Sequence, residues 1–205
     1  AGPTYFSEVA DVFELGYRAT LSRMTSFSVT AFEHRYDRLR SGQFEGGSLL
    51  ISNMIEGDVS GLSAWASWQA RSNWRLSVGG TLLDKDLRLK PGSNDPVGPS
   101  NLGNDPDYQV LLRSSFDITP QHQFDMLLRH VDELPLPRVP SHTALDMRFG
   151  WRPSLQWELS LTLQDVLDSS HEEFGAPLDR SEFERGAFVK IQWRRWGRCN
   201  RRRSQ

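Results

Sequence analysis

Apolar and polar side chains alternate one by one between residues 145 and 163, and no other feature constrains the fold of this chain as strongly. The apolar positions form two runs separated by turn-like residues 152–156: Leu145, Met147, Phe149 and Trp151, then Trp157, Leu159, Leu161 and Leu163. Alternation with a period of two predicts a β-hairpin with one apolar face and one charged face. We expect Trp151 to lie opposite Trp157 across the turn.

The same alternation recurs along the chain and predicts an all-β, up-and-down antiparallel sheet. About nine strands are expected, of the roughly ten-residue length that a tilted membrane strand needs, approximately at 13–21, 27–31, 50–68, 74–82, 110–116, 124–128, 145–151, 157–163 and 187–193. Short turns are expected near residues 24, 71, 120 and 154, and they alternate with longer, solvated loops at 36–47, 84–107, 134–140 and 168–184. Such loop asymmetry is typical of an outer-membrane β-barrel.

The overall composition excludes membrane-spanning helices, because only 38% of the residues are hydrophobic and no long apolar run exists. The mean hydropathy of −0.52 does not exclude a membrane barrel, whose lumen residues dilute its apolar ones. A net charge of −2 argues against a nucleic-acid partner. The single cysteine, Cys199, argues against an internal disulfide framework. No signal peptide is visible, so we expect a mature chain or a piece of a longer one.

Aromatic side chains flank every predicted short turn on the apolar face. They are Phe27, Trp68, Trp74, Phe116, Phe124, Trp151, Trp157 and Trp193. A ring of aromatic residues at one height is typical of a membrane interface, because the ring body is apolar while the indole N–H prefers the headgroup zone. We therefore expect a periplasmic-side girdle that contacts outer-membrane lipid.

A soluble β-sandwich or lipocalin-like ligand-binding barrel is the alternative architecture. Such a barrel would fill its interior with apolar side chains. In this chain the second face carries many charges: Arg18, Arg75, Arg113, Arg129, Arg148, Glu14, Asp125, Asp146 and Glu158. The charged face favours a water-filled lumen.

No catalytic or metal-binding pattern stands out in the sequence. The five histidines lie in different predicted elements without an i, i+4 pair, so no metal site is expected: His34, His122, His130, His142 and His171. Ser141 and His142 would point to opposite faces of a strand and cannot act as a catalytic pair. We expect no enzyme activity and no bound cofactor.

Several motifs, in this order, resemble the C-terminal barrel of TonB-dependent outer-membrane receptors, especially those for iron complexes. They are FELGYR (13–18), Phe32 with YDRLR (36–40), NMIEG (53–57) before Gly61 and Leu62, LLDKD (82–86), LGNDP (102–106), VPSHTALD (139–146), QDVLD (164–168) before His171, and KIQWR (190–194). The chain departs from the family pattern at Ser63, at Asp165 and after Arg194. The resemblance covers residues 1–195 and leaves a basic C-terminal tail, 196–205, as a solvated extension.

The resemblance implies a barrel of about 22 strands with an N-terminal plug, a TonB box and an iron-chelate ligand such as a ferric siderophore. This chain would be about the last two-fifths of such a barrel, since an open sheet leaves unpaired edges in hydrocarbon. The missing barrel strands and the plug would be its partners, and TonB would act only through the missing part. Anionic chelates point to four lumen-facing candidates: Arg75, Arg113, Arg129 and Arg148.

Overall fold

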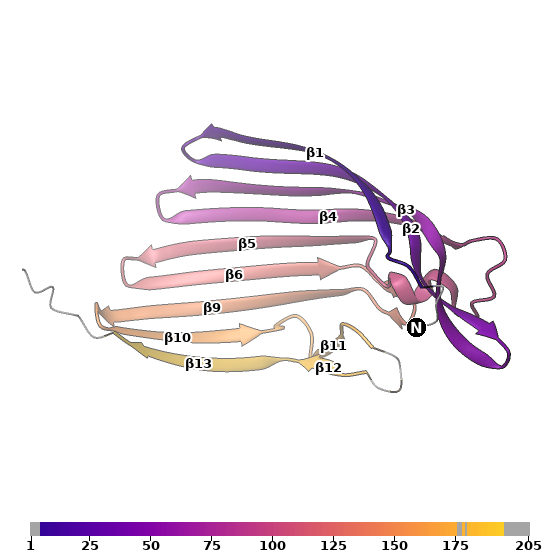
Figure 1. Cartoon of the computed structure of the whole chain (residues 1–205). Helices are drawn as coiled ribbons and strands as arrows, with labels where there is room; N and C mark the ends of the chain where they lie inside the picture. The colour runs from indigo at the N-terminus through magenta and orange to yellow at the C-terminus, as the bar shows by residue number, and fades with distance from the viewer. Residues whose placement is uncertain (1–4, 176–177, 179, 195–205) are drawn as a thin grey trace, which may run out of the picture.

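The computed structural model describes residues 5–175, 178 and 180–194, which form one curved antiparallel sheet of nine strands (Figure 1). The strands are β1 (Val9–Ser22), β2 (Thr25–Glu45), β3 (Ser48–Arg71), β4 (Trp74–Leu89), β5 (Tyr108–Thr119), β6 (His122–Val131), β9 (His142–Ser154), β10 (Trp157–Gln164) and β13 (Gly186–Trp193). Each strand pairs with its neighbours in this order, so the predicted all-β, up-and-down architecture is confirmed. Pairing between β1 and β13 is absent from the described residues, and the sheet is open.

Small elements occur in the connections at one end of the sheet. They are β7 (Leu134–Pro135) with β8 (Arg138–Val139), β11 (Ser170–Glu172) with β12 (Glu182–Glu184), and the 3-10 helix η1 (Gly98–Leu102). The helical structure within the described ranges lacks the length and hydropathy needed to cross a membrane.

The connections divide between the two ends of the sheet as the sequence predicts. Two-residue turns at 23–24, 72–73, 120–121 and 155–156 lie at the left end in Figure 1. The longer connections lie at the opposite end, which we call the loop end, together with one further two-residue turn at 46–47. The predicted basic tail, 196–205, lies outside the described residues.

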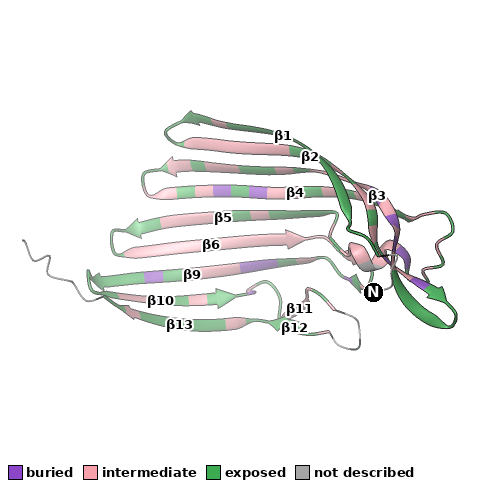
Figure 2. Ribbon diagram, in the orientation of Figure 1, coloured by how far each residue is buried: buried purple, intermediate pink, exposed green. Residues whose placement is uncertain are grey.

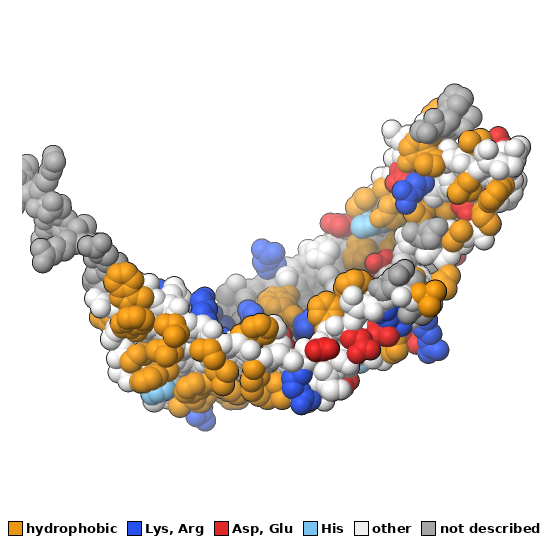
Figure 3. All heavy atoms as spheres, turned by 90° about the horizontal axis from the view of Figure 1, so that it is seen from below, with side chains coloured by type: hydrophobic (Ala, Val, Ile, Leu, Met, Phe, Trp, Pro, Cys, Tyr) orange, Lys and Arg blue, Asp and Glu red, His pale blue; other side chains and the backbone are white. Residues whose placement is uncertain are grey.

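The ladder register separates the two faces over the whole width of the sheet. Val78, Leu112, Leu128 and Leu145 form one apolar row, because each lies opposite the next on adjacent strands. Figure 3 shows the sheet as a curved trough with hydrophobic side chains gathered on its convex side. Within the described ranges no second sheet or long helix packs on that side, and Leu112 and Phe149 are each 42% exposed. The soluble-sandwich alternative is therefore not favoured.

The register of the hairpin formed by β9 and β10 differs from the expected one by two residues. Trp151 lies opposite Leu159 rather than Trp157, because β9 continues to Ser154 and a bulge lies between Trp157 and Leu159. The turn is therefore shorter than the sequence suggests. A two-residue shift keeps every side chain on its predicted face.

The predicted loop at 36–47 is instead a long hairpin. Strand β2 continues to Glu45, and Gly46 and Gly47 form the turn with φ values of 59° and 81°. Positive φ at both central residues is the requirement of a type I′ hairpin turn, which glycine meets without strain. Sequence alternation fails here because this hairpin extends past the two-faced sheet and carries register shifts around Leu39.

The predicted solvated loop at 84–107 is shorter, because β4 continues to Leu89. The loop also packs against the long hairpin. The Gly42 N–H donates to Asp95 Oδ2 at 2.6 Å, and Gln43 Nε2 donates to Ser93 Oγ at 2.8 Å. Figure 2 shows that buried positions are few and that several of them lie at this loop end.

Candidate functional site

The four predicted lumen-facing arginines lie on the same, concave face of the sheet. Arg148 lies opposite Asp125, Asp125 opposite Ser115, and Ser115 opposite Arg75, which places Arg75 and Arg148 in one row. The same register assigns Arg113 and Arg129 to neighbouring rows of this face. Their shared orientation agrees with the sequence analysis, whereas their role in ligand contact stays a prediction.

Arg148 is held by charged neighbours rather than free for a ligand. It donates to Asp125 Oδ2 at 3.0 Å, to Glu158 Oε1 at 2.7 Å and to Gln123 Oε1 at 3.1 Å. These groups come from three adjacent strands, β6, β9 and β10. The ion pairs brace the concave face and leave little positive charge for a substrate.

Arg113 and Arg75 are exposed and differ from Arg148 in their surroundings. Among the described residues, no carboxylate lies within 4.0 Å of either guanidinium. Arg75 donates instead to Gln69 Oε1 at 3.0 Å. Arg113 borders a hollow of about 380 Å³ that also touches Asp125 and Thr162. These two arginines could attract an anion.

A second hollow, of about 420 Å³, lies on the same face around Trp65. The Trp65 ring covers Gly79 so closely that a Cβ at residue 79 would lie 2.1 Å from the ring. Gln109 and Arg129 also line this hollow. The alternation of the sequence does not single out Trp65 as a concave-face residue. The signal for it is Gly79 directly opposite, because a glycine leaves room for an aromatic ring on the neighbouring strand.

The eight predicted girdle aromatics share the convex face near the short turns. Trp74 lies opposite Phe116 with ring centroids 6.3 Å apart, and Phe116 lies opposite Phe124. Trp157 lies opposite Trp193 at the last pair of strands. The pairing of their strands also places Phe27, Trp68 and Trp151 on the convex face. Contact of this row with lipid stays a prediction.

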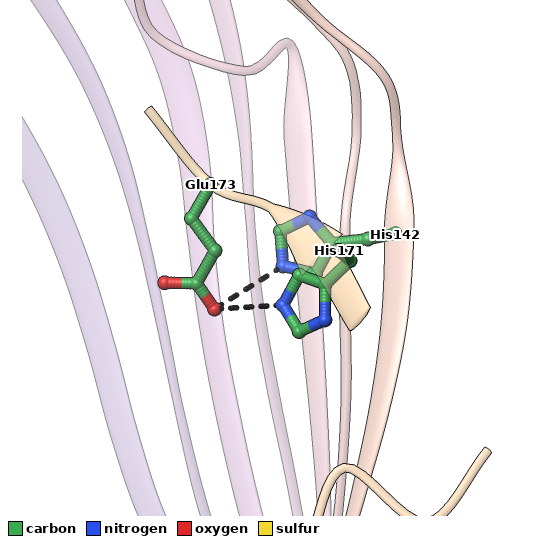
Figure 4. Close-up of side chains that lie close together, drawn as sticks. All are labelled: His142, His171 and Glu173. Atoms are coloured by element: carbon green, nitrogen blue, oxygen red, sulfur yellow. Dashed lines mark hydrogen bonds and ion pairs between the residues drawn. The ribbon is translucent and has the colours of Figure 1, made fainter. Parts of the chain in front are cut away.

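Two of the five histidines lie side by side, although they belong to different elements, as the sequence predicts. The His142 ring, at the start of β9, stacks on the His171 ring of β11 with centroids 4.3 Å apart (Figure 4). Folding of the loop after β10 back onto β9 makes this contact, which spacing along the chain does not reveal. Glu173 faces both rings.

Carboxylates on both sides control the charge of the His171 ring. Its Nδ1 lies 2.7 Å from Asp165 Oδ2, and its Nε2 lies 3.0 Å from Glu173 Oε1. Burial lowers the pKa of His171, but the hydrogen bonds to Glu173 and Asp165 outweigh burial and raise this pKa above its ordinary value. The cluster is thus a second polar centre, separate from the arginine rows.

The chain is similar in sequence and in fold to known receptors, although no protein-family model matches it. The pesticin receptor of Yersinia enterocolitica (serotype O:8) is 23% identical over 184 residues, which cover 83% of this chain and 26% of that receptor. The chain thus spans about a quarter of the length of this curated relative.

Two solved structures share the fold. The siderophore receptor PiuA from Acinetobacter baumannii is 18% identical, with a TM-score of 0.73 over 90% of this chain and 28% of that chain. The FrpB iron transporter from Neisseria meningitidis (F5-1 variant) is 12% identical, with a TM-score of 0.77 over 94% of this chain and 32% of that chain. In each case the sheet of this chain matches only part of a much longer protein.

Proposed function

This chain has the fold of part of the β-barrel of TonB-dependent outer-membrane receptors, and we propose that it forms one section of the wall of a receptor that takes up iron chelates. The relatives are receptors of the Gram-negative outer membrane. We place this chain in the same membrane because its sequence and its fold are similar to theirs. Ferric siderophores are the proposed substrate class.

One observation carries this proposal. The sheet has an apolar convex face that no described element covers and a charged concave face, and this sheet aligns with siderophore-receptor structures over 90% of the chain. An uncovered apolar face needs lipid or protein around it, because exposed apolar area of this extent is unfavourable in water. A charged concave face suits a hydrated lumen.

The open edges of the sheet favour the interpretation that it belongs to a larger barrel. The backbone groups at the outer edges of β1 and β13 have no strand partner in the described part of the chain. Each unpaired N–H or C=O in hydrocarbon costs several kcal/mol. We therefore propose that further strands of the same receptor pair with β1 and β13. The plug, and contact with TonB, would belong to those further parts.

Anionic chelates would meet the concave face first at its unpaired positive charges. Of the four arginines, Arg113 and Arg75 are the best candidates to attract an anion. Arg148 is paired with two carboxylates, and Arg129 lies near Glu173. A positive potential inside a lumen raises the local concentration of an anionic ligand. Trp65 adds an exposed ring against which a catecholate or other flat group could stack.

Uptake of radiolabelled iron tests this function. The whole protein would be produced in a strain that lacks its own siderophore receptors, and cells would be offered a panel of ferric siderophores with and without an uncoupler. We expect uptake of at least one chelate that the uncoupler abolishes. No uptake of any chelate by folded receptor, or uptake that the uncoupler leaves unchanged, would contradict the proposal.

A matched pair of variants locates the effect on the concave face. Arg113→Gln should lower the initial rate of uptake several-fold, because it removes an unpaired lumen charge. Arg71→Gln removes the same charge beside a short turn and should leave the rate unchanged. Catalysis is not proposed, since the named relatives are receptors and transporters rather than enzymes.

A further inference from the structure

We propose that His142, His171 and Glu173 bind a divalent transition-metal ion of the zinc class at the loop end of the sheet. The three ligand atoms lie within 4.8 Å of one another. Glu173 Oε1 lies 3.0 Å from His171 Nε2 and 3.6 Å from His142 Nε2, and Figure 4 shows this oxygen pointing toward one nitrogen of each ring. This inference is independent of the proposed uptake of iron chelates.

The donor set and its spacing suit this class of ion. Two imidazole nitrogens and one carboxylate oxygen form a common zinc site, and three protein ligands leave a fourth position for water or a small ligand. Metal–ligand bonds of about 2.0–2.1 Å place neighbouring ligand atoms of a tetrahedral site about 3.3 Å apart. The two distances to Glu173 lie on either side of that value.

The first independent observation is an unsatisfied nitrogen. Among the described residues, His142 Nε2 has no hydrogen-bond partner although it is buried, and its side chain is only 9% exposed. A buried polar atom without a partner is unfavourable and is rare in folded proteins. A metal ion between this nitrogen and Glu173 would supply the missing partner.

The second observation is a supporting carboxylate behind His171. Asp165 Oδ2 lies 2.7 Å from His171 Nδ1, and its side chain is 7% exposed. A carboxylate that accepts the Nδ1 proton orients the ring and directs Nε2 at a metal, as in carboxylate–histidine–zinc arrangements. Asp165 is itself fixed, because its backbone N–H donates to Asp146 Oδ1 at 3.1 Å.

Metal binding requires two adjustments of the cluster. The two rings are nearly parallel, with an interplanar angle of 19°, so they must tilt toward one another for both Nε2 lone pairs to reach one ion. The ion would also replace the proton that His171 Nε2 shares with Glu173, and binding would release it. Arg129 Nη1, 3.7 Å from Glu173 Oε1, is the neighbouring charge that opposes a cation.

Isothermal titration of the whole, tag-free protein with Zn²⁺ in detergent tests the site. We expect one saturable site per chain. His142→Ala, His171→Ala and Glu173→Gln should each weaken it at least 10-fold. Asp165→Asn, which keeps a residue tolerant of the observed φ of 52°, should weaken it about 10–100-fold. Arg129→Gln should tighten it. His122→Ala, at the opposite end of the sheet, should have no effect.

Absorption of Co²⁺ bound to the unmodified protein gives a test that needs no variant. Visible d–d bands of low-coordinate Co²⁺ that Zn²⁺ removes would support the site. The absence of saturable binding by folded wild-type protein would overturn the proposal. Binding that the His142, His171 and Glu173 variants leave unchanged in folded protein would overturn it equally.

Discussion

Strand β3 passes through two regions that are built differently. In the two-faced sheet its large side chains stay exposed on both sides, with Trp65 at 44% and Trp68 at 51%. At the loop end of the same strand, Ile55 is 1% exposed and Asn53 is 7% exposed. The loop end therefore buries side chains within the chain, whereas the sheet leaves them to its surroundings.

This difference indicates where each region obtains its stability. At the loop end, hydrogen bonds and packing between the long hairpin, the 90–107 loop and the sheet hold the chain together. In the sheet, backbone ladders pair neighbouring strands, but side-chain burial stays incomplete. Under the proposed function, lipid covers the convex face and the concave face meets a hydrated lumen.

The largest expected effect comes from a charge on the convex face of the sheet. Met147 lies in the middle of β9, opposite Met126 on β6 and Leu163 on β10. Met147→Arg should lower the free energy of unfolding of the whole protein in lipid vesicles by about 2–4 kcal/mol, because it places a cation near the bilayer midplane. Denaturant titration of tryptophan fluorescence measures this change.

The neighbouring residue provides the control for that substitution. Arg148→Ala breaks ion pairs on the hydrated face and should cost far less, about 1 kcal/mol or below. Equal losses of unfolding free energy at the two positions would show that both faces of β9 meet the same surroundings. Such a result would contradict the assignment of lipid to one face and of a hydrated lumen to the other.

A smaller effect is expected at the loop end, where side chains are buried within the chain itself. Asn53 Oδ1 accepts from the Phe6 N–H at 2.6 Å, and its Nδ2 donates to Arg38 O at 2.6 Å. Asn53→Ala removes these partly buried hydrogen bonds and should cost about 1–3 kcal/mol. Hydrogen exchange should quicken at the long hairpin and not at the short turns.

Ser48→Ala, at the exposed tip of the same hairpin, is the matched control and should leave exchange unchanged. If Asn53→Ala also quickens hydrogen exchange at the short turns, the two regions unfold together. The two parts of β3 would then not be separate in stability.

The sheet region could be predicted well because its physics is local. Alternation along each strand assigns the two faces, so Leu112 and Arg113 separate correctly without any knowledge of their neighbours. The predicted register of β9 against β10 differs from the observed register by two residues. Alternation cannot distinguish the two registers, because a two-residue shift leaves every side chain on the same face. Only the bulge after Trp157 and the short turn distinguish the two registers.

The loop end could not be predicted in the same way. In the hairpin that turns at Gly46 and Gly47, the β2 arm is mostly polar, whereas the β3 arm begins with the consecutive apolar residues 49–51, so neither arm alternates. The cluster of His142 and His171 depends on a loop that returns to the start of β9, and no spacing rule connects residues so far apart. The resemblance to iron-complex receptors identified the fold, but it did not indicate this cluster.

Adjacent leucines on β5 give the most direct test of the central claim, that the convex face meets lipid and the concave face meets water. Leu112 belongs to the convex apolar row, and Leu111 lies opposite Gly79 and Arg129 on the concave face. Spin labels at Leu112→Cys and Leu111→Cys, each in the whole protein with Cys199→Ser in lipid bilayers, report accessibility to oxygen and to a water-soluble nickel chelate. We expect the label at residue 112 to be more accessible to oxygen and the label at residue 111 to be more accessible to the nickel chelate. Equal accessibility at the two sites, or the reverse pattern, would contradict it.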